Sequence, residues 1–230
     1  MLADINPQIF RQYDIRGVAE RDLQDETIEL LGKAFGSYIK KSGTKQVLIG
    51  RDNRLSSNRL RDALTRGLLS AGCDVVDIGM VVTPVLYYAR IHYGIDGGVM
   101  ITGSHNPPED NGFKLALGDG TIYGEEIQKL KQMMIAGAYP AGQGSLAERD
   151  ALPHYLAMLK EKIALGPRRL KVAVDCGNGT ASLVAVQILE NWGCEVIPLY
   201  CESDGSFPNH QPDPVKTANL TVLRKTVTDK

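Results

Sequence analysis

The sequence has no long apolar run and almost no net charge. No stretch approaches the roughly 18 apolar residues that cross a bilayer, and the first residues lack the apolar core of a signal peptide. We therefore expect a cytoplasmic protein that does not bind membranes. The 26 basic and 27 acidic residues give a net charge of −1, which offers no basic excess for nucleic acid. A small-molecule substrate is favoured.

Cysteine is scarce as well. The four cysteines, at positions 73, 176, 194 and 201, show no Cys-x-x-Cys spacing and no clustered histidines. This pattern argues against a structural zinc site. We expect reduced and mostly buried thiols, which is the usual state of free cysteine in a cytoplasmic protein.

Short apolar runs alternate with amphipathic stretches along the chain. This alternation predicts an α/β fold: a mixed, mostly parallel sheet with helices on both faces, followed by a second, incomplete α/β unit of similar type. Apolar spacing predicts helices at Glu26–Lys41 and Ser57–Ala71, with Ser57 as the cap of the latter. Thr83 is expected to cap a helix that starts at Pro84. FKLAL and TIY, on either side of residues 118–120, predict an antiparallel hairpin.

The segment AGAYPAGQG, residues 136–144, is small, uncharged and proline-bearing, so it predicts a linker. We accordingly divide the chain into a first domain, residues 1–145, and a second, residues 146–230. The second contains the strands LKVAVDC and EVIPLY and, between them, the turn GNGTAS and a helix that ends near Trp192. Two strands are few for a doubly wound domain, so we expect it to be truncated.

Candidate chemistry concentrates in one loop after a predicted buried strand. Ser104 leaves the strand, His105 and Asn106 follow at once, and Lys114 lies ten residues later on the returning strand. Phosphoryl transfer needs an oxygen nucleophile with positive charge around the transferred group, which Ser104, His105 and Lys114 could supply. A serine hydrolase is the rival interpretation, but G-x-S-x-G is absent. In extended backbone His105 would also point away from Ser104.

The turn GNGTAS, residues 177–182, indicates a different class of protein. It resembles the first half of a dinucleotide-binding fingerprint, and Glu202 lies about 20 to 25 residues later, where a ribose-binding acid could sit. Ser182 occupies the position of the third glycine. A nucleotide-binding Rossmann-type protein therefore stays open as an alternative.

The string TGSHNPPEDNGFK, residues 102–114, is similar to the active-site serine loop of the α-D-phosphohexomutase family, above all its bacterial phosphomannomutase/phosphoglucomutase branch. The resemblance extends over nearly the whole chain. It includes FRQYDIRG at 10–17, GRDNRLSS at 50–57, VVTPVLYYA at 81–89, VAVDCGNGTA at 172–181 and DGSFPNHQPDP at 204–214.

The resemblance implies that Ser104 is phosphorylated, gives its phosphoryl group to a hexose monophosphate and regains one from hexose 1,6-bisphosphate. It implies Mg²⁺, held between the phosphate on Ser104 and three aspartates of a DGDxDR loop. That loop does not occur in this sequence, and the isolated pairs at Asp119 and Asp204 lack its second aspartate. We therefore expect a piece of a longer enzyme that does not complete turnover alone.

The resemblance also assigns roles around Ser104. It places His105 beside the phosphoserine and Lys114 near the transferring group, Arg16 and Tyr13 in contact with substrate phosphate, and Asn106 in ordering the loop.

The motif GRDNRLSS and the substrate complete what the resemblance implies. It makes Arg51 and Asp52 structural supports at the end of a strand. The implied substrates are mannose or glucose phosphates, with phosphoglucosamine mutase and a non-catalytic sugar-phosphate binder as alternatives, and the full-length enzyme is expected to be a monomer or weak dimer.

Overall fold

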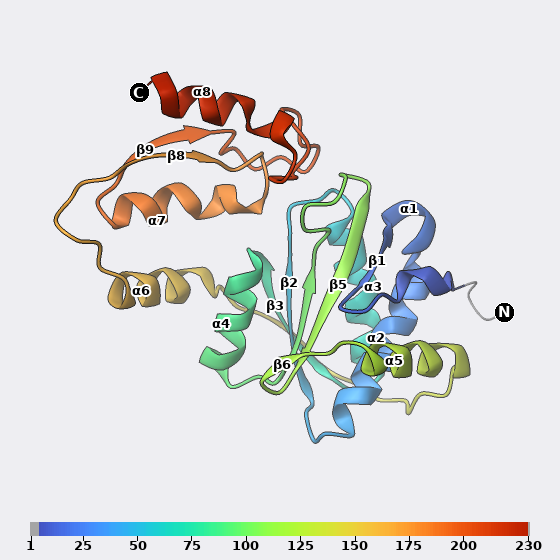
Figure 1. Cartoon of the computed structure of the whole chain (residues 1–230). Coiled ribbons are helices and arrows are strands. Elements are labelled where there is room, and N and C mark those ends of the chain that lie inside the picture. The colour runs from blue at the N-terminus through green and yellow to red at the C-terminus, as the bar shows by residue number, and fades with distance from the viewer. Residues whose placement is uncertain (1–4, 230) are drawn as a thin grey trace.

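The computed structural model describes residues 5–229, and its larger unit is built on a seven-stranded sheet. Its strands are β1 (Ile15–Val18), β2 (Gln46–Arg51), β3 (Asp74–Met80), β4 (Gly97–Ile101), β5 (Asp110–Leu117), β6 (Gly120–Thr121) and β7 (Leu146–Glu148). The order is β1-β5-β4-β2-β3-β7, with β6 paired to β5 (Figure 1). The pairs β2–β4, β2–β3 and β3–β7 are parallel, whereas β5 is antiparallel to β1, β4 and β6. The predicted α/β class, mixed sheet and hairpin are confirmed.

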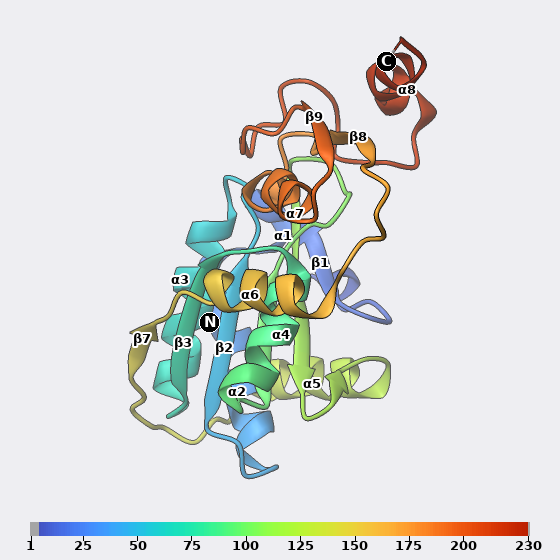
Figure 2. The same cartoon turned by 90° about the vertical axis from the view of Figure 1, so that its left-hand side faces the viewer.

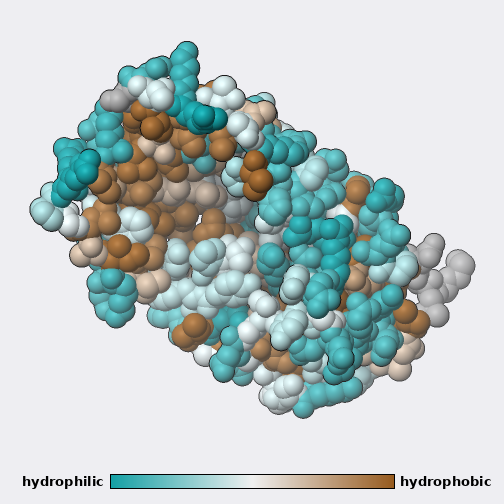
Figure 3. Space-filling view, in the orientation of Figure 1, coloured by the Kyte–Doolittle hydropathy of each residue, from teal (hydrophilic) through white to brown (hydrophobic). Residues whose placement is uncertain are grey.

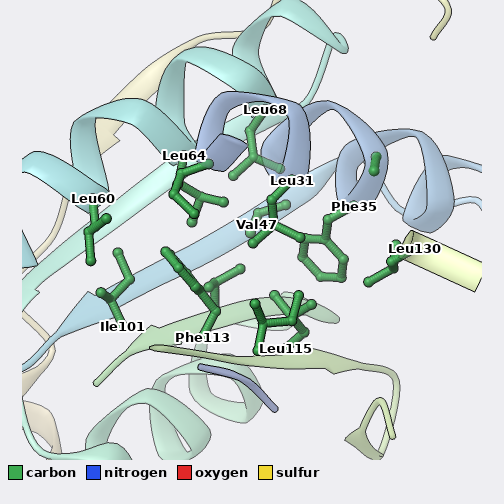
Figure 4. Close-up of a cluster of buried hydrophobic side chains, with 14 of the residues drawn as sticks. Leu31, Phe35, Val47, Leu60, Leu64, Leu68, Ile101, Phe113, Leu115 and Leu130 are labelled. Atoms are coloured by element: carbon green, nitrogen blue, oxygen red, sulfur yellow. The ribbon is translucent and has the colours of Figure 1, made fainter. Parts of the chain in front are cut away.

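Helices pack on both faces of this sheet. They are α1 (Ala19–Asp22), α2 (Asp25–Lys40), α3 (Ser57–Ser70), α4 (Thr83–Tyr93) and α5 (Glu125–Ala136). Because successive strand residues face opposite sides, Val47 of β2 joins the cluster under α2 and α3, whereas Leu48 joins the cluster under α4. Figure 4 shows Phe35 and Leu64 of the helices directed toward Phe113 of the sheet. Burying each such side chain contributes about 2 kcal/mol.

Helices α2 and α3 approach closely at two glycines. A Cβ atom on Gly67 would lie 2.1 Å from the carbonyl oxygen of Glu29, and one on Gly32 would lie 2.4 Å from that of Leu64. Backbone therefore packs on backbone at this crossing, and no side chain larger than hydrogen fits at either position.

Two helix starts differ from the prediction by one residue. Helix α3 begins at Ser57 with Ser56 in the N-cap position, and α4 begins at Thr83 with Val82 before it. The hydroxyl of Ser57 donates to the carboxylate of Asp52, 2.5 Å away, instead of capping the helix. A tertiary hydrogen bond thus replaces the local one that the sequence pattern suggested.

The second unit is smaller. It contains the parallel strands β8 (Lys171–Asp175) and β9 (Glu195–Leu199) and the helices α6 (Leu152–Lys162), α7 (Ala185–Asn191) and α8 (Thr221–Asp229). Short 3₁₀ helices lie at Thr180–Leu183 and Thr217–Leu220, and the first unit has one at Pro7–Ile9. Helices α6, α7 and α8 have no fully buried residue. Figure 3 shows apolar side chains on the hollowed surface of this unit, as a small, open sheet requires.

The connection between the units starts within the first sheet. Strand β7 pairs with β3 through residues 146–148, so three residues beyond the predicted division at 145 extend the first sheet. The division itself stays a prediction, and its outermost residues, 1–4 and 230, lie outside the described part. After β7, α6 lies beside α4 (Figure 2), where the rings of His92 and His154 are 4.7 Å apart.

The four cysteines are free thiols. Cys73 and Cys194 are buried, whereas Cys176 and Cys201 are half-buried with their sulfur atoms 3.0 Å apart. Burial, helped by the hydrogen bond from Cys201, raises the pKa of Cys176 to about 12, so this thiol is protonated at neutral pH. Between residues 5 and 229 no helix is long and apolar enough to cross a membrane.

Candidate active site

A pocket of about 300 Å³ opens where the parallel strands β2 and β4 end. Polar groups collect there because the carboxyl ends of neighbouring parallel strands meet at one edge of the sheet. Both units contribute to the lining, which includes Asp52, Arg54, Thr102, Ser104, Thr180 and Phe207. The predicted serine therefore stands at the junction between the two units.

Ser104 has a backbone conformation that the sequence analysis did not anticipate. Its φ angle of 55° lies in the left-handed region, which non-glycine residues adopt at a cost of about 1–2 kcal/mol. Its amide donates to Thr102 Oγ1 at 2.9 Å, and its own Oγ lies exposed, 3.3 Å from Nδ1 of His105. The expectation that His105 points away from Ser104 was wrong, because it assumed extended backbone. The left-handed turn brings the two side chains together.

Arg16 and Lys114 lie on neighbouring strands and share one carboxylate. Arg16 Nη2 donates to Asp14 Oδ2 at 2.5 Å, and Lys114 Nζ lies 3.9 Å from the same oxygen. Arg16 Nη1 also donates to Asn106 Oδ1 at 2.7 Å, and the Asn106 amide donates to Asp110 at 2.8 Å. Because β1 pairs with β5, the first motif of the sequence is thus held against the serine loop.

Tyr13 stands apart from these contacts. It precedes β1 and is 71% exposed. The structure therefore joins Arg16, Asn106 and Lys114 in one network through Asp14, and it pairs Ser104 with His105 at the start of the same loop, while Tyr13 lies at the surface. Arg51, expected to be a support, donates through its guanidinium to Asn58 at 2.7 Å and to Asp77 at 3.3 Å.

Arg54 is the residue that sequence reasoning missed. Its Nη1 donates to the carbonyls of Pro107 and, at 2.9 Å, Asp110, and its Nη2 donates to those of Ser104 at 3.0 Å and Asn106 at 2.8 Å. The side chain is 1% exposed. Burial lowers the pKa of the guanidinium, and the neighbouring carboxylate of Asp52 opposes this shift. One arginine thus binds four backbone carbonyls of the serine loop.

Asp52 supports both the arginine and the loop. Its carboxylate accepts hydrogen bonds from Arg54 Nε at 3.2 Å, from Ser57 Oγ at 2.5 Å and from the amide of Gly103 at 3.1 Å. The loop lies so close to the guanidinium that a Cβ atom on Gly103 would be 2.4 Å from Arg54 Cζ. The predicted support role of Asp52 fits these contacts. The available signal for Arg54 was its position beside Asp52 just after a buried strand.

The turn GNGTAS contacts the first unit at Asn53. The amide of Asn53 donates to Thr180 Oγ1 at 3.0 Å, and its side chain donates to the carbonyl of Asn178 at 2.7 Å and to Ser203 Oγ at 3.0 Å. Asn178 is buried, and its side-chain amide donates to the Glu202 carbonyl at 2.9 Å. Thr180 and the carbonyl of Asn178, both in the turn that suggested a nucleotide site, are thus engaged in joining the two units.

Comparison with known proteins decides the family. The family model for phosphoglucomutase/phosphomannomutase α/β/α domain I matches residues 7–139, and that for domain II matches residues 153–230. The chain belongs to this family. The curated relatives include the phosphomannomutase/phosphoglucomutase of Pseudomonas aeruginosa, 49% identical over 94% of this chain and 46% of that protein. The phosphoglucomutase of Neisseria meningitidis serogroup B is 42% identical over 96% of this chain and 48% of that protein.

A solved family structure agrees with the fold of both units. The phosphoglucomutase/phosphomannomutase family protein of Burkholderia thailandensis superposes with a TM-score of 0.94 at 40% identity, over 98% of this chain and 51% of that one. This chain therefore spans about half the length of the relatives that it matches.

Family membership implies Mg²⁺ in the complete enzymes. Between residues 5 and 229, no group of three or more histidine, cysteine, aspartate or glutamate side chains is arranged to hold a metal ion. The exposed oxygen of Ser104 is the group of this site that fits such an ion, once it carries a phosphate.

Proposed function

We propose that this chain supplies the phosphoserine site of a phosphohexomutase that interconverts hexose 1-phosphate and hexose 6-phosphate. The observation that carries the proposal is the geometry at Ser104, whose exposed hydroxyl lies on a left-handed turn close to His105. Arg54 binds the carbonyl of Ser104, and Arg16 binds Asn106 of the same loop. Mannose and glucose phosphates are the proposed substrates, as the names of the relatives suggest. The proposed location is the cytoplasm, and the proposed form a monomer or weak dimer.

In the proposed reaction Ser104 Oγ attacks a phosphorus atom of hexose 1,6-bisphosphate. The bond from phosphorus to Oγ forms as the bond to the sugar oxygen breaks. The serine proton passes to Nδ1 of His105, and the departing sugar oxygen takes a proton from Lys114. Asp14 holds Lys114 and Arg16 on one side of the loop, where their charges stabilise the transferred oxygens. The products are phosphorylated Ser104 and a hexose monophosphate. In the reverse direction the phosphoserine transfers its phosphoryl group to the free hydroxyl of a bound hexose monophosphate, which regenerates hexose 1,6-bisphosphate and the free serine.

Bound Mg²⁺ would neutralise charge on the transferred group. The phosphate on Ser104 is its proposed ligand in this chain. The aspartates that complete such a site in the family have no counterpart among the described residues. Tyr13 and Asn106 are proposed to help bind substrate phosphate, Tyr13 from the exposed surface and Asn106 through its contact with Arg16.

The test uses the full-length product of the source gene, incubated with glucose 1,6-bisphosphate and Mg²⁺. Intact-mass and peptide measurements should show one added phosphate on the peptide that contains Ser104. Ser104→Ala should lower mutase activity by several orders of magnitude without changing the unfolding temperature. Ser42→Ala, at an exposed serine just after helix α2, is the matched control and should retain activity.

Three outcomes would redirect the proposal. Sugar-phosphate binding without phosphate transfer to Ser104 would indicate a non-catalytic binder. Faster turnover of glucosamine phosphate would indicate a phosphoglucosamine mutase. Phosphate found on another residue of an active enzyme would show that the assignment of Ser104 is wrong.

A further inference from the structure

The backbone of the serine loop depends on one guanidinium. The carbonyl groups of Ser104, Asn106, Pro107 and Asp110 all accept hydrogen bonds from Arg54, which lies about 50 residues earlier in the chain. A planar guanidinium presents two terminal nitrogens in a fixed fork and can serve four acceptors in fixed directions. An ammonium group has three donors and no such fork, so lysine cannot reproduce this arrangement.

Burying the charge of Arg54 costs free energy, which its contacts must offset. The Arg54 side chain is 1% exposed, and the carboxylate that pairs with it among the described residues is Asp52, at 3.2 Å. Apolar side chains usually stabilise such positions at least as well as a buried ion pair. A buried arginine whose terminal nitrogens contact one functional loop therefore indicates that the loop must be held in place.

A residue of the second unit covers the same guanidinium. The ring centroid of Phe207 lies 5.4 Å from Arg54 Cζ, a cation–π distance, and Phe207 is buried with a φ angle of 52°. The neighbouring Gly205 approaches the first unit so closely that a Cβ atom on it would lie 2.1 Å from the carbonyl oxygen of Asn53. The loop at 204–207 is therefore packed against the residues that carry Arg54.

We propose that Arg54 is the positioning residue of the phosphoserine loop, and that Phe207 holds its guanidinium in place. The position of Ser104 then depends on how the second unit docks on the first. Arg54 acts through the loop backbone and not through substrate, because both terminal nitrogens already donate to loop carbonyls. This inference rests on the proposed role of Ser104 as phosphoryl acceptor.

The experiment measures how fast Ser104 gains phosphate in the full-length gene product as glucose 1,6-bisphosphate is varied. Arg54→Lys should lower the maximal rate at least about tenfold, because the fork that orients the loop is lost. The half-saturating concentration should change less than about twofold, because substrate contacts remain. Arg90→Lys is the matched control. Arg90 is also buried and donates to two carbonyls, those of Asp96 and Gly118, at the opposite edge of the sheet.

A second pair of variants keeps the proposal testable if Arg54→Lys fails to fold. Phe207→Leu keeps an apolar side chain but removes the aromatic face, and should lower the maximal rate about threefold. Its control is Tyr93→Leu, which removes the contact between Arg149 and the Tyr93 ring, 4.9 Å apart, at another point near the junction. Circular dichroism confirms folding of each variant at the assay temperature.

The outcomes separate this inference from the proposed function. If the wild-type protein never gains phosphate on Ser104, the proposed function fails. If the wild type gains phosphate and folded Arg54→Lys and Phe207→Leu proteins gain it at the wild-type rate, the positioning role is refuted. An equal loss of rate in Arg90→Lys or Tyr93→Leu would also overturn it, since the effect would then reflect general destabilisation.

Discussion

Replacing Asp52 by asparagine is the sharpest test of how the serine loop is held. The substitution preserves the shape of the side chain and removes its charge. In the structure the carboxylate accepts from Arg54 Nε, Ser57 Oγ and the amide of Gly103. An asparagine has one acceptor oxygen, and its NH₂ group would face one or more of these donors. Arg54 would keep its charge with no anionic partner in direct contact.

The magnitude follows from burial. Removing one partner of a buried ion pair costs about 3–5 kcal/mol, because the other charge stays buried and uncompensated. The side chains of Arg54 and Asp52 are 1% and 9% exposed, so solvent does not screen the loss. For a chain of this size we expect the unfolding temperature of Asp52→Asn to fall by about 6 to 20 °C.

Urea unfolding, followed by circular dichroism, measures the loss of unfolding free energy in Asp52→Asn. Asp62→Asn is the control, because Asp62 also pairs with an arginine, Arg61, but its side chain is 55% exposed. The control should stay within about 0.5 kcal/mol of the wild type. If Asp52→Asn loses less than about 1 kcal/mol of unfolding free energy, the buried pair does not hold the loop in place.

Two further predictions concern the core and the response to acid. Gly67→Ala should destabilise the protein by more than about 1 kcal/mol despite the higher helix propensity of alanine, because its Cβ would press on the carbonyl of Glu29. Gly36→Ala, whose Cβ would meet side-chain atoms at 3.0 Å and beyond, should lose less, and equal losses in urea would contradict the backbone clash. The hydrogen bond from Arg21 holds the pKa of Asp22 well below its usual range, so its stabilisation is present at neutral pH and is lost as pH falls below about 4. Asp22→Asn should therefore be less stable than the wild type at pH 7, by about 2 kcal/mol. The difference should shrink toward pH 2 in a urea titration, and a constant difference would refute the charge argument.

The sequence could predict what depends on neighbouring residues. Apolar periodicity located the helices to within a residue or two, because the apolar face of each helix comes from residues close together in the sequence. The serine loop was identified through its resemblance to a known family, which also rests on neighbouring residues, a string of thirteen between 102 and 114. Arg54 could not be found in this way, because its acceptors lie 50 to 56 residues further along.

Local patterns also misled where tertiary contacts compete with them. Ser57 has the residue type of a helix cap, yet its hydroxyl bonds Asp52, and the helix starts one residue earlier than the cap prediction allows. The backbone of Ser104 leaves the extended region because Thr102 and Arg54 hold the residues around it. Neither the hydrogen bond of Ser57 nor the backbone conformation of Ser104 can be predicted from the residues next to it in the sequence.

The charges around Ser104 indicate that the proposed phosphate would need a further cation. The positive charges of Arg16, Arg54 and Lys114 are matched by the carboxylates of Asp14, Asp52 and Asp110, which lie within the same network of contacts. The unphosphorylated site is therefore close to neutral. A phosphate adds about −1.5 to −2 charges at neutral pH, which these residues cannot balance. Because Arg54 already donates to the loop carbonyls, its charge contributes to the local field without a hydrogen bond to spare for the phosphate. In the proposed phosphorylated form, Arg16 and Lys114 would remain to bind the phosphate oxygens, and a divalent ion would supply the rest of the balance.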